Sequence, residues 1–241
     1  MSLVKYCNEK YNIAKGCPTI QLGTLQYYRE LDPSFTIADP NEGKYSFIIE
    51  DYDPVKGQET GTSQFVPIHA RLGNVIMMHT FPNCYIFCLS ADIGKNYLEM
   101  GKTFSPEYNS YYKITDIDTF SIKLANILVE NITLEHLNLG SQNKEQRLTL
   151  GDIKSISVRI LNRFIKYWRV KSEIISNSKF QIDTEDLDPI SRFLFTKDSK
   201  FKEEREFRIA FLFEHPKFGT LSVKKAPILL PINVFAHEIQ I

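Results

Sequence analysis

Alternating hydrophobic and polar positions recur along the chain and predict more strands than helices. Ile20 and Leu22 alternate with Gln21, which predicts a strand at Thr19–Leu25. The almost wholly apolar segment Cys84–Ser90 is typical of a strand at the centre of a sheet. Further strands are expected at Tyr45–Glu50, Phe65–His69, Val75–His79, Ser155–Ile160, Glu206–Phe213, Leu221–Val223 and Ile228–Val234. The second and third of these resemble a hairpin around Gly73-Asn74.

Two helices are predicted. Asp118–Asn131 has an apolar stripe at helical spacing, and Asp118 is expected to cap it. A shorter helix is expected to open at Asp188-Pro189 and to run through Phe195, because proline is tolerated at the first helical position. Residues 160–168 fit either a continued strand or a helix. The stripe consists of Phe120, Leu124, Ile127 and Leu128.

Residues 37–43 and 51–62 are rich in proline, glycine and polar residues and are expected to be loops. No repeat, low-complexity tract or linker divides the chain. Strands outnumber helices, and few helices alternate with strands as a doubly wound sheet requires. We therefore expect one domain over residues 1–241, of the α+β class, with a mainly antiparallel, β-rich mixed sheet and a few helices.

Charge and composition narrow the functional classes. The 29 Lys+Arg residues balance 29 Asp+Glu residues, which gives no support to a general binder of nucleic acids or anionic membranes. No apolar run is long enough to span a bilayer, so no membrane partner is expected. Residues 1–11 are polar and do not resemble a secretion signal, which predicts a cytoplasmic protein with reduced cysteines. The sequence does not indicate the oligomeric state.

Metal and nucleotide motifs are missing from the sequence. Cys84 and Cys88 are too far apart for a redox pair, and no histidine lies at a recognised zinc spacing from them. No metal cofactor is therefore expected. Neither a Walker-type loop nor a Gly-x-Gly-x-x-Gly motif is present, which argues against the common nucleoside triphosphatases.

The most informative segment is Phe201–Ile209. On a strand, Glu204, Glu206 and Arg208 would share one face at a spacing of about 6.6 Å, with phenylalanines facing the core. Such carboxylates can hold a substrate hydroxyl and stabilise positive charge in an oxocarbenium-like transition state. The alternative is an exposed face on which Glu204 and Arg208 form weak cross-strand ion pairs.

Three segments resemble a group of uncharacterised prokaryotic proteins, many of them found near phage-defence and toxin genes. The segments are Thr19–Arg29 followed by Asp39–Gly43, then Ile86–Ser90, and finally Phe195–Lys197 with Phe201–Ile209. The Glu-x-Glu of the last segment is similar to that on the catalytic strand of NAD-dependent ADP-ribosyltransferases. The resemblance implies an ADP-ribosyltransferase-like fold.

The resemblance also implies roles for individual residues. Glu206 matches the catalytic glutamate, Glu204 the first glutamate of the pair, and Ser90 the serine that closes a strand beside the nicotinamide. The first-strand histidine or arginine that anchors NAD has no match on Thr19–Leu25, and Arg29 is the best substitute. NAD is then the expected substrate, with a protein or nucleic acid as the acceptor, and a defence or toxin effector as the biological role.

Other residues of these segments are candidates for the same site. Tyr27 and Tyr28 would point to opposite faces of a continued strand, and one of them, with Tyr28 as the candidate, would stack on a base or nicotinamide ring. Asp39 and Glu42 are either bonded locally or solvated, or they bind ribose or metal. Arg208 is a further candidate for substrate binding.

Three alternatives remain open at this point. The chain could be a non-catalytic module that binds a nucleotide, nucleic acid or protein in the same cleft. It could be a nuclease with a divalent metal held by Asp39, Glu42 and Glu206. The basic and aromatic segment Arg159–Lys171 either contacts nucleic-acid phosphates or is simply a solvated face.

Overall fold

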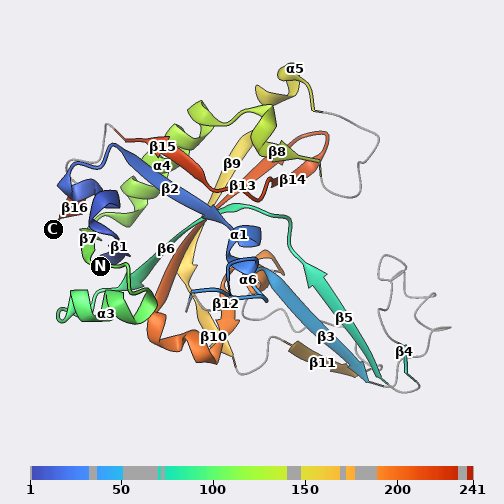
Figure 1. The fold of residues 1–241 in the computed structure, drawn as a ribbon. Coiled ribbons are helices and arrows are strands. Elements are labelled where there is room, and N and C mark those ends of the chain that lie inside the picture. Colours follow the sequence, from blue (N-terminus) through green and yellow to red (C-terminus); the bar gives the residue numbers. More distant parts are fainter. Residues whose placement is uncertain are drawn as a thin grey trace. The chain divides into compact units, whose positions relative to one another are not determined.

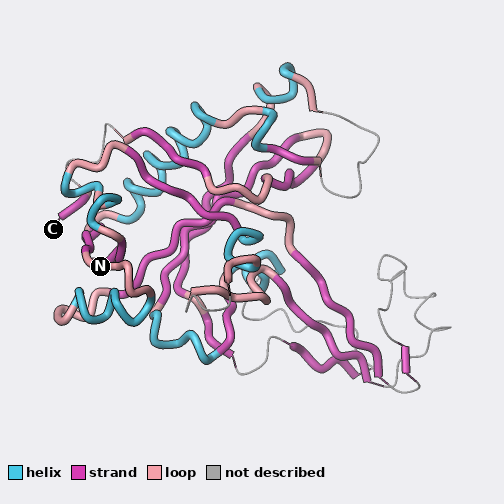
Figure 2. The backbone as a smooth tube through the Cα atoms, viewed as in Figure 1, coloured by secondary structure: helices cyan, strands magenta, loops and turns pink. Residues whose placement is uncertain are grey.

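The computed structural model describes residues 2–32, 37–50, 70–71, 74–139, 148–168, 172–176, 189–232 and 238–240. Their contacts divide the chain into two compact units. Unit 1 comprises residues 1–42, 82–165 and 202–241, and unit 2 comprises residues 43–81 and 166–201. The fold is of the α+β class with mainly antiparallel pairing, as predicted (Figures 1 and 2). The single domain remains a prediction, because contacts alone do not decide whether these units are separate domains.

Unit 1 is built on one antiparallel sheet. The strands along its main path are, in order, β16 (Ile239–Gln240), β7 (Ser110–Ile114), β1 (Leu3–Cys7), β6 (Tyr85–Ala91), β13 (Glu206–His215), β14 (Gly219–Val223) and β8 (Leu137–Asn138). Three strands branch from this path: β9 (Ser157–Phe164) pairs with β13, β2 (Thr19–Thr24) with β6, and β15 (Ile228–Pro231) with β2.

The helices of unit 1 are short except for one. They are α1 (Leu25–Arg29), α3 (Tyr97–Phe104), α4 (Ile117–Asn131), α5 (Leu150–Ile153) and the 3₁₀ turns η1 (Glu9–Tyr11), η2 (Ile13–Lys15) and η3 (Leu134–His136). The 3₁₀ segment η5 (Ser199–Glu204) passes from unit 2 into unit 1. No helix among the described residues is long and apolar enough to cross a membrane.

Unit 2 contains two small sheets. One has the strand order β11 (Ser172–Ser176), β3 (Lys44–Glu50), β5 (Asn74–Thr80) and β4 (Ala70–Arg71). The other pairs β10 (Lys166–Trp168) with β12 (Thr196–Asp198) in parallel, and α6 (Pro189–Leu194) precedes β12. The strands expected at Tyr45–Glu50 and Val75–His79 and the helix after Asp188 are confirmed within one or two residues. The strand expected at Phe65–His69 and the loop at 51–62 lie outside the described residues.

The main core of unit 1 lies between α4 and one face of the sheet. The predicted stripe of α4 is buried, and Phe120 packs on Phe87 of β6 with ring centroids 5.6 Å apart. The cap was assigned wrongly: Asp116, not Asp118, accepts the backbone N–H of Thr119. The N–H bonded by a cap side chain lies two or three residues further on, which places the start of the helix after Asp116.

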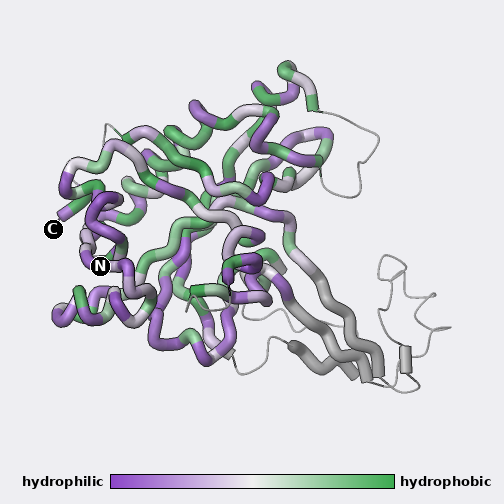
Figure 3. The backbone as a smooth tube through the Cα atoms, viewed as in Figure 1, coloured by the Kyte–Doolittle hydropathy of each residue, from purple (hydrophilic) through white to green (hydrophobic). Residues whose placement is uncertain are grey.

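Strand β13 is the central strand of this unit. Phe207, Ile209, Phe211 and Phe213 point into the main core, as expected from their alternation. Figure 3 shows hydrophobic residues along β13 and β6. The opposite face of β13 is buried as well, because every residue from Glu206 to Phe213 is buried. The alternative interpretation, in which Glu206 and Arg208 lie on a solvent-exposed face of the strand, is therefore wrong.

Two elements differ from their predictions, and a third decides an alternative that the sequence left open. The chain turns into helix α1 after Thr24, whose side chain accepts the backbone N–H of Tyr27, so that Tyr27 and Tyr28 lie on a helix and not on a continued strand. Strand β1 was missed because its alternation is short. Residues 157–164 form a strand throughout, since β13 supplies a long partner for every residue of β9.

Candidate functional site

The two glutamates of the Glu-x-Glu segment lie on different elements. Glu204 ends η5, and Glu206 begins β13. Arg205, between them, has a φ of 45°, in the left-handed region that non-glycine residues seldom adopt. This turn breaks the strand alternation, so that Glu204 does not share a strand face with Glu206 and Arg208. The expected row of three is reduced to two.

Glu206 occupies a fixed position on the sheet. It is paired in register with Ser90 on β6, and the next residue on the same face, Arg208, is paired with Cys88. Residues paired across an antiparallel ladder have their Cβ atoms about 5 Å apart. The structure thus brings together Glu206 and Ser90, the two residues that the resemblance singled out from segments more than one hundred positions apart.

Arg208 holds two carboxylates at once. Its Nε and Nη2 lie 2.8 and 2.7 Å from Oε1 of Glu206, and its Nη1 and Nη2 donate to the two oxygens of Glu42 at 2.6 and 3.1 Å. Side-chain exposure within this group is 1–4%. Burial alone would lower the pKa of Arg208, but the two carboxylates raise it well above its usual value.

Glu42 reaches Arg208 from a tight turn. The backbone N–H of Glu42 donates to the carbonyl of Asp39 at 2.9 Å, and the Asp39 carboxylate accepts the N–H of Asn41 at 2.9 Å. Asp39 and Glu42 are only 1% and 2% exposed. The local N–H bonding considered for Asp39 is confirmed, whereas solvation of the two carboxylates is wrong.

Strand β6 changes partners beside this network. Along the edge of β6 that does not pair with β13, Ser90 and Ala91 pair with β1, whereas Tyr85 and Ile86 pair with β2. Between these two pairings β1 and β2 diverge and the sheet forks (Figure 1). Points at which neighbouring strands separate are common places for ligand pockets.

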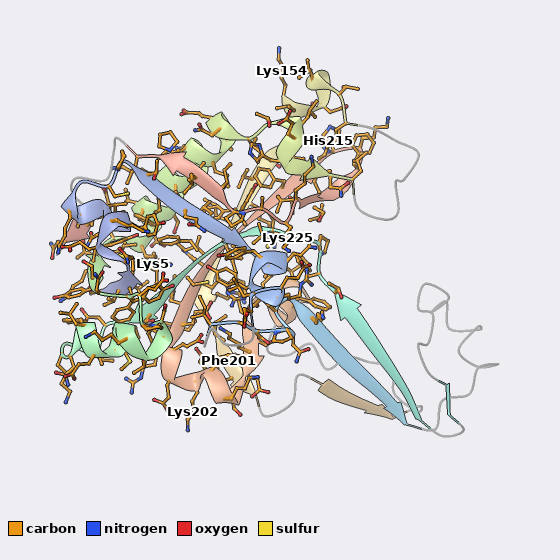
Figure 4. The ribbon with its side chains drawn as sticks, viewed as in Figure 1. Lys5, Lys154, Phe201, Lys202, His215 and Lys225 are labelled. Carbon is orange, nitrogen blue, oxygen red and sulfur yellow. The ribbon has the colours of Figure 1, made fainter. Side chains whose placement is uncertain are left out.

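Lys5 of β1 lies in the fork (Figure 4). Its Nζ donates to the backbone carbonyl of Cys88 at 2.9 Å and lies 4.6 Å from the centre of the Phe87 ring. Burial lowers the pKa of Lys5 below its usual value, and the charge of Glu206 opposes this shift. Lys5 is therefore a partly desolvated ammonium within electrostatic reach of the candidate carboxylate.

A cavity of about 180 Å³ occupies the same fork. Residues of both diverging strands line it, including Lys5 of β1 and Gly23 of β2. Seven of its 17 lining residues are aromatic: Phe87 and the six tyrosines Tyr6, Tyr11, Tyr27, Tyr28, Tyr108 and Tyr112. A cavity of about 150 Å³ is enough to hold one benzene ring, so this one fits a single substituted aromatic ring.

Tyr28 of the cavity wall packs on β2. A Cβ atom on Gly23 would lie only 2.5 Å from Cε2 of Tyr28, so the ring rests directly on the glycine backbone. Burial raises the pKa of Tyr28 well above its usual value, with smaller contributions from Cys88, Tyr108 and Glu206. The phenol therefore stays protonated at neutral pH, within electrostatic reach of Glu206.

Arg29 does not line this cavity. It ends α1 and is partly buried. Burial lowers its pKa, which the nearby charges of Glu42 and Glu30 oppose. Arg29 thus lies on the Glu42 side of the network, and Lys5 is the cation at the cavity.

The geometry bears on the metal-dependent alternative. Glu42 and Glu206 do converge, but they converge on the Arg208 guanidinium, which takes the place a cation would occupy. Across the described ranges, no group of three or more His, Cys, Asp or Glu residues could hold a metal ion. Glu42 and Glu206 therefore bind the Arg208 side chain in the place where a nuclease would bind its metal.

Cys84, directly before β6, and Cys88 on β6 lie within electrostatic reach of the Arg208 network. Burial raises the pKa of Cys84 to about 12 and raises that of Cys88 further, and the Cys88 thiol is hydrogen-bonded to Glu206. Both remain thiols at neutral pH, which makes them poor nucleophiles and metal ligands.

Sequence reasoning missed Lys5 and the cavity. The signal was present, because Lys5 interrupts an otherwise apolar pattern over Leu3–Cys7 and two tyrosines follow within six residues. The basic segment from Arg159 is a strand edge in which Arg159 pairs with Glu214 at 3.7 Å and both side chains are exposed. Residues 169–171 lie outside the described part.

Comparison with known proteins gives no further assignment. No family model, no curated protein and no solved structure matches the chain. The residues of the site therefore carry the functional argument.

Proposed function

We propose that the chain is an ADP-ribosyltransferase-like enzyme that uses NAD, with Glu206 as the catalytic carboxylate. It would act in the cytoplasm on a protein or nucleic-acid acceptor, as a phage-defence or toxin effector. The observation that carries the proposal is the pairing of Glu206 with Ser90, with Glu206 in electrostatic reach of Lys5 and Tyr28, which line a ring-sized cavity.

The chemistry needs a fixed negative charge at one place. When the bond between the nicotinamide nitrogen and the ribose carbon breaks, the electron pair leaves with nicotinamide and positive charge develops on the ribose. A carboxylate already oriented toward that position lowers the barrier without reorganising. Arg208 holds one oxygen of Glu206 through two contacts, which supplies this orientation.

The cavity suits the leaving group. The nicotinamide ring of NAD is a pyridinium cation, which aromatic faces attract. The phosphate next to its ribose is an anion, for which the Lys5 ammonium provides a charge-assisted donor. Lys5 replaces Arg29 in this proposal as the first-strand anchor, because β1 and not β2 is the first strand of the chain.

A second candidate function is a non-catalytic module that binds a nucleotide in the same cavity. The observation that favours it is the burial of Glu206, which is 3% exposed and already paired with Arg208. Neither Glu206 nor Ser90 lines the cavity, so catalysis needs the ribose of the bound nucleotide to extend to Glu206, whereas binding does not.

The test is NAD turnover by the purified chain with released nicotinamide quantified. Release by the wild-type protein and a raised KM in Lys5→Met support the enzyme and its anchor. Calorimetric binding of NAD without any release supports the module. Absence of both binding and release would contradict both functions. Lys154→Met is the matched control, since Lys154 is exposed at the end of α5 and does not line the cavity.

A further inference from the structure

Four charged residues of unit 1 alternate in sign from β13 to α1. Glu206 contacts Arg208, Arg208 contacts Glu42, and Glu42 lies within electrostatic reach of Arg29. Arg29 belongs to the same helical turns as Tyr27 and Tyr28, which line the cavity. The chain of charges thus links the candidate carboxylate to the wall of the candidate binding site.

Glu42 is the member best placed to orient the others. Its two oxygens accept from Nη1 and Nη2 of Arg208, a bidentate geometry that fixes the plane of the guanidinium. The guanidinium plane in turn sets where Nε and Nη2 hold Glu206. Because Glu42 is presented by a turn closed through Asp39, its own position is also restrained.

Glu42 contributes more than charge balance. It lies within electrostatic reach of Arg29, but its two short contacts are both with the Arg208 guanidinium. A second buried carboxylate adds a desolvation cost that apolar residues of similar volume would avoid. The bidentate clamp is what the second carboxylate adds.

We propose that Glu42 is a positioning residue for Glu206, acting through Arg208 and joining the carboxylate to the cavity wall on α1. The inference rests on the proposed function. It adds a residue that touches neither the cavity nor the reacting atoms. Glu42 and Arg208 are 166 positions apart in the sequence but are hydrogen-bonded in the structure.

The test compares Glu42→Gln, Glu42→Asp and Glu206→Gln in nicotinamide release. Glu42→Gln keeps the size of the side chain and one acceptor, but it cannot clamp the guanidinium with two charged oxygens. We expect kcat to fall on the order of 10- to 100-fold with KM within about two-fold, because misplacing a catalytic group by an ångström has effects of this size. Glu42→Asp should recover part of the loss.

The control is Glu30→Gln, which also neighbours Arg29 but pairs with Lys225 at the surface. It should leave both constants unchanged. A purely structural Glu42 would lower the melting temperature of Glu42→Gln while the folded enzyme kept its kcat, and that result overturns the inference. Loss of turnover in Glu206→Gln with normal turnover in Glu42→Gln overturns it and leaves the proposed function intact. If the wild-type protein releases no nicotinamide, the result overturns both the inference about Glu42 and the proposed enzyme function.

Discussion

Ser90 and Glu206 face each other across the ladder between β6 and β13. On one side of Ser90 the sheet continues into β1, and five residues earlier β6 pairs instead with β2. The pair therefore lies beside the fork that holds the aromatic cavity. Neither residue lines that cavity, but Glu206 lies within electrostatic reach of Lys5 and Tyr28 in its wall, which is why we place the candidate site at this fork.

Arg208 should be essential for the stability of unit 1. Replacing it with methionine leaves Glu42 and Glu206 buried without their cation, and losing one partner of a buried ion pair typically costs about 3–5 kcal/mol. Urea denaturation at neutral pH measures the free energy of unfolding. The control is Arg159→Met, whose exposed pair with Glu214 should contribute less than about 1 kcal/mol. Equal losses in the two variants would contradict a buried network.

Gly23→Ala should displace the ring of Tyr28. The new methyl group would lie 2.5 Å from Cε2 of the ring, and relieving such an overlap typically costs about 1–3 kcal/mol. Gly151→Ala is the control, because its nearest neighbour is Thr149 at 3.6 Å and alanine favours the helix there. The melting temperature of Gly23→Ala should therefore fall, and that of Gly151→Ala should rise. An unchanged Gly23→Ala would show that Tyr28 does not rest on β2.

Alkaline pH should destabilise the protein. Burial raises the pKa of Tyr6, Tyr85 and Tyr108 to about 12, against about 10 in the unfolded chain. Between these values the folded state binds more protons, so stability falls as pH rises from about 10 to about 12. Lys5, with its lowered pKa, acts in the opposite direction, but only below pH 10.5, whereas the three tyrosines act above about pH 10.

A spectroscopic titration checks this prediction. Tyrosinate absorbance in the folded protein should rise in two steps, with the buried phenols ionising only as the protein unfolds. A single step near the pKa of free tyrosine, with no loss of stability below pH 12, would contradict the packing of these tyrosines around the fork.

The fold class and most strands could be predicted because their signal is local. The alternation of hydrophobic and polar residues predicted the strand β13, and a continuous apolar run predicted that β6 lies at the centre of a sheet. The turn at Arg205 could not be predicted, since its left-handed backbone follows from how η5 joins β13 and not from any glycine. Helix α1 was missed because a capping threonine, Thr24, redirects a strand-like pattern.

The candidate site was predictable in its members more than in its geometry. Glu206, Ser90, Glu42 and Arg208 were all singled out, and the structure brings them together. Their burial was not predicted, because charged residues are expected to be exposed to solvent unless a partner of opposite charge is known. Glu42 and Arg208 are partners only through tertiary folding. The role of Lys5 depends on the divergence of β1 from β2, which no local pattern encodes.

The role of Glu206 is best measured as nicotinamide release from NAD by Glu206→Gln and Glu204→Gln beside the wild-type protein. We expect the wild type to release nicotinamide and Glu206→Gln to reduce turnover by about 100-fold or more, since it removes the charge fixed by Arg208. Glu204→Gln should retain most of its release, because Glu204 ends η5 and lies off the strand. Equal activity in the wild type and in folded Glu206→Gln would contradict the account.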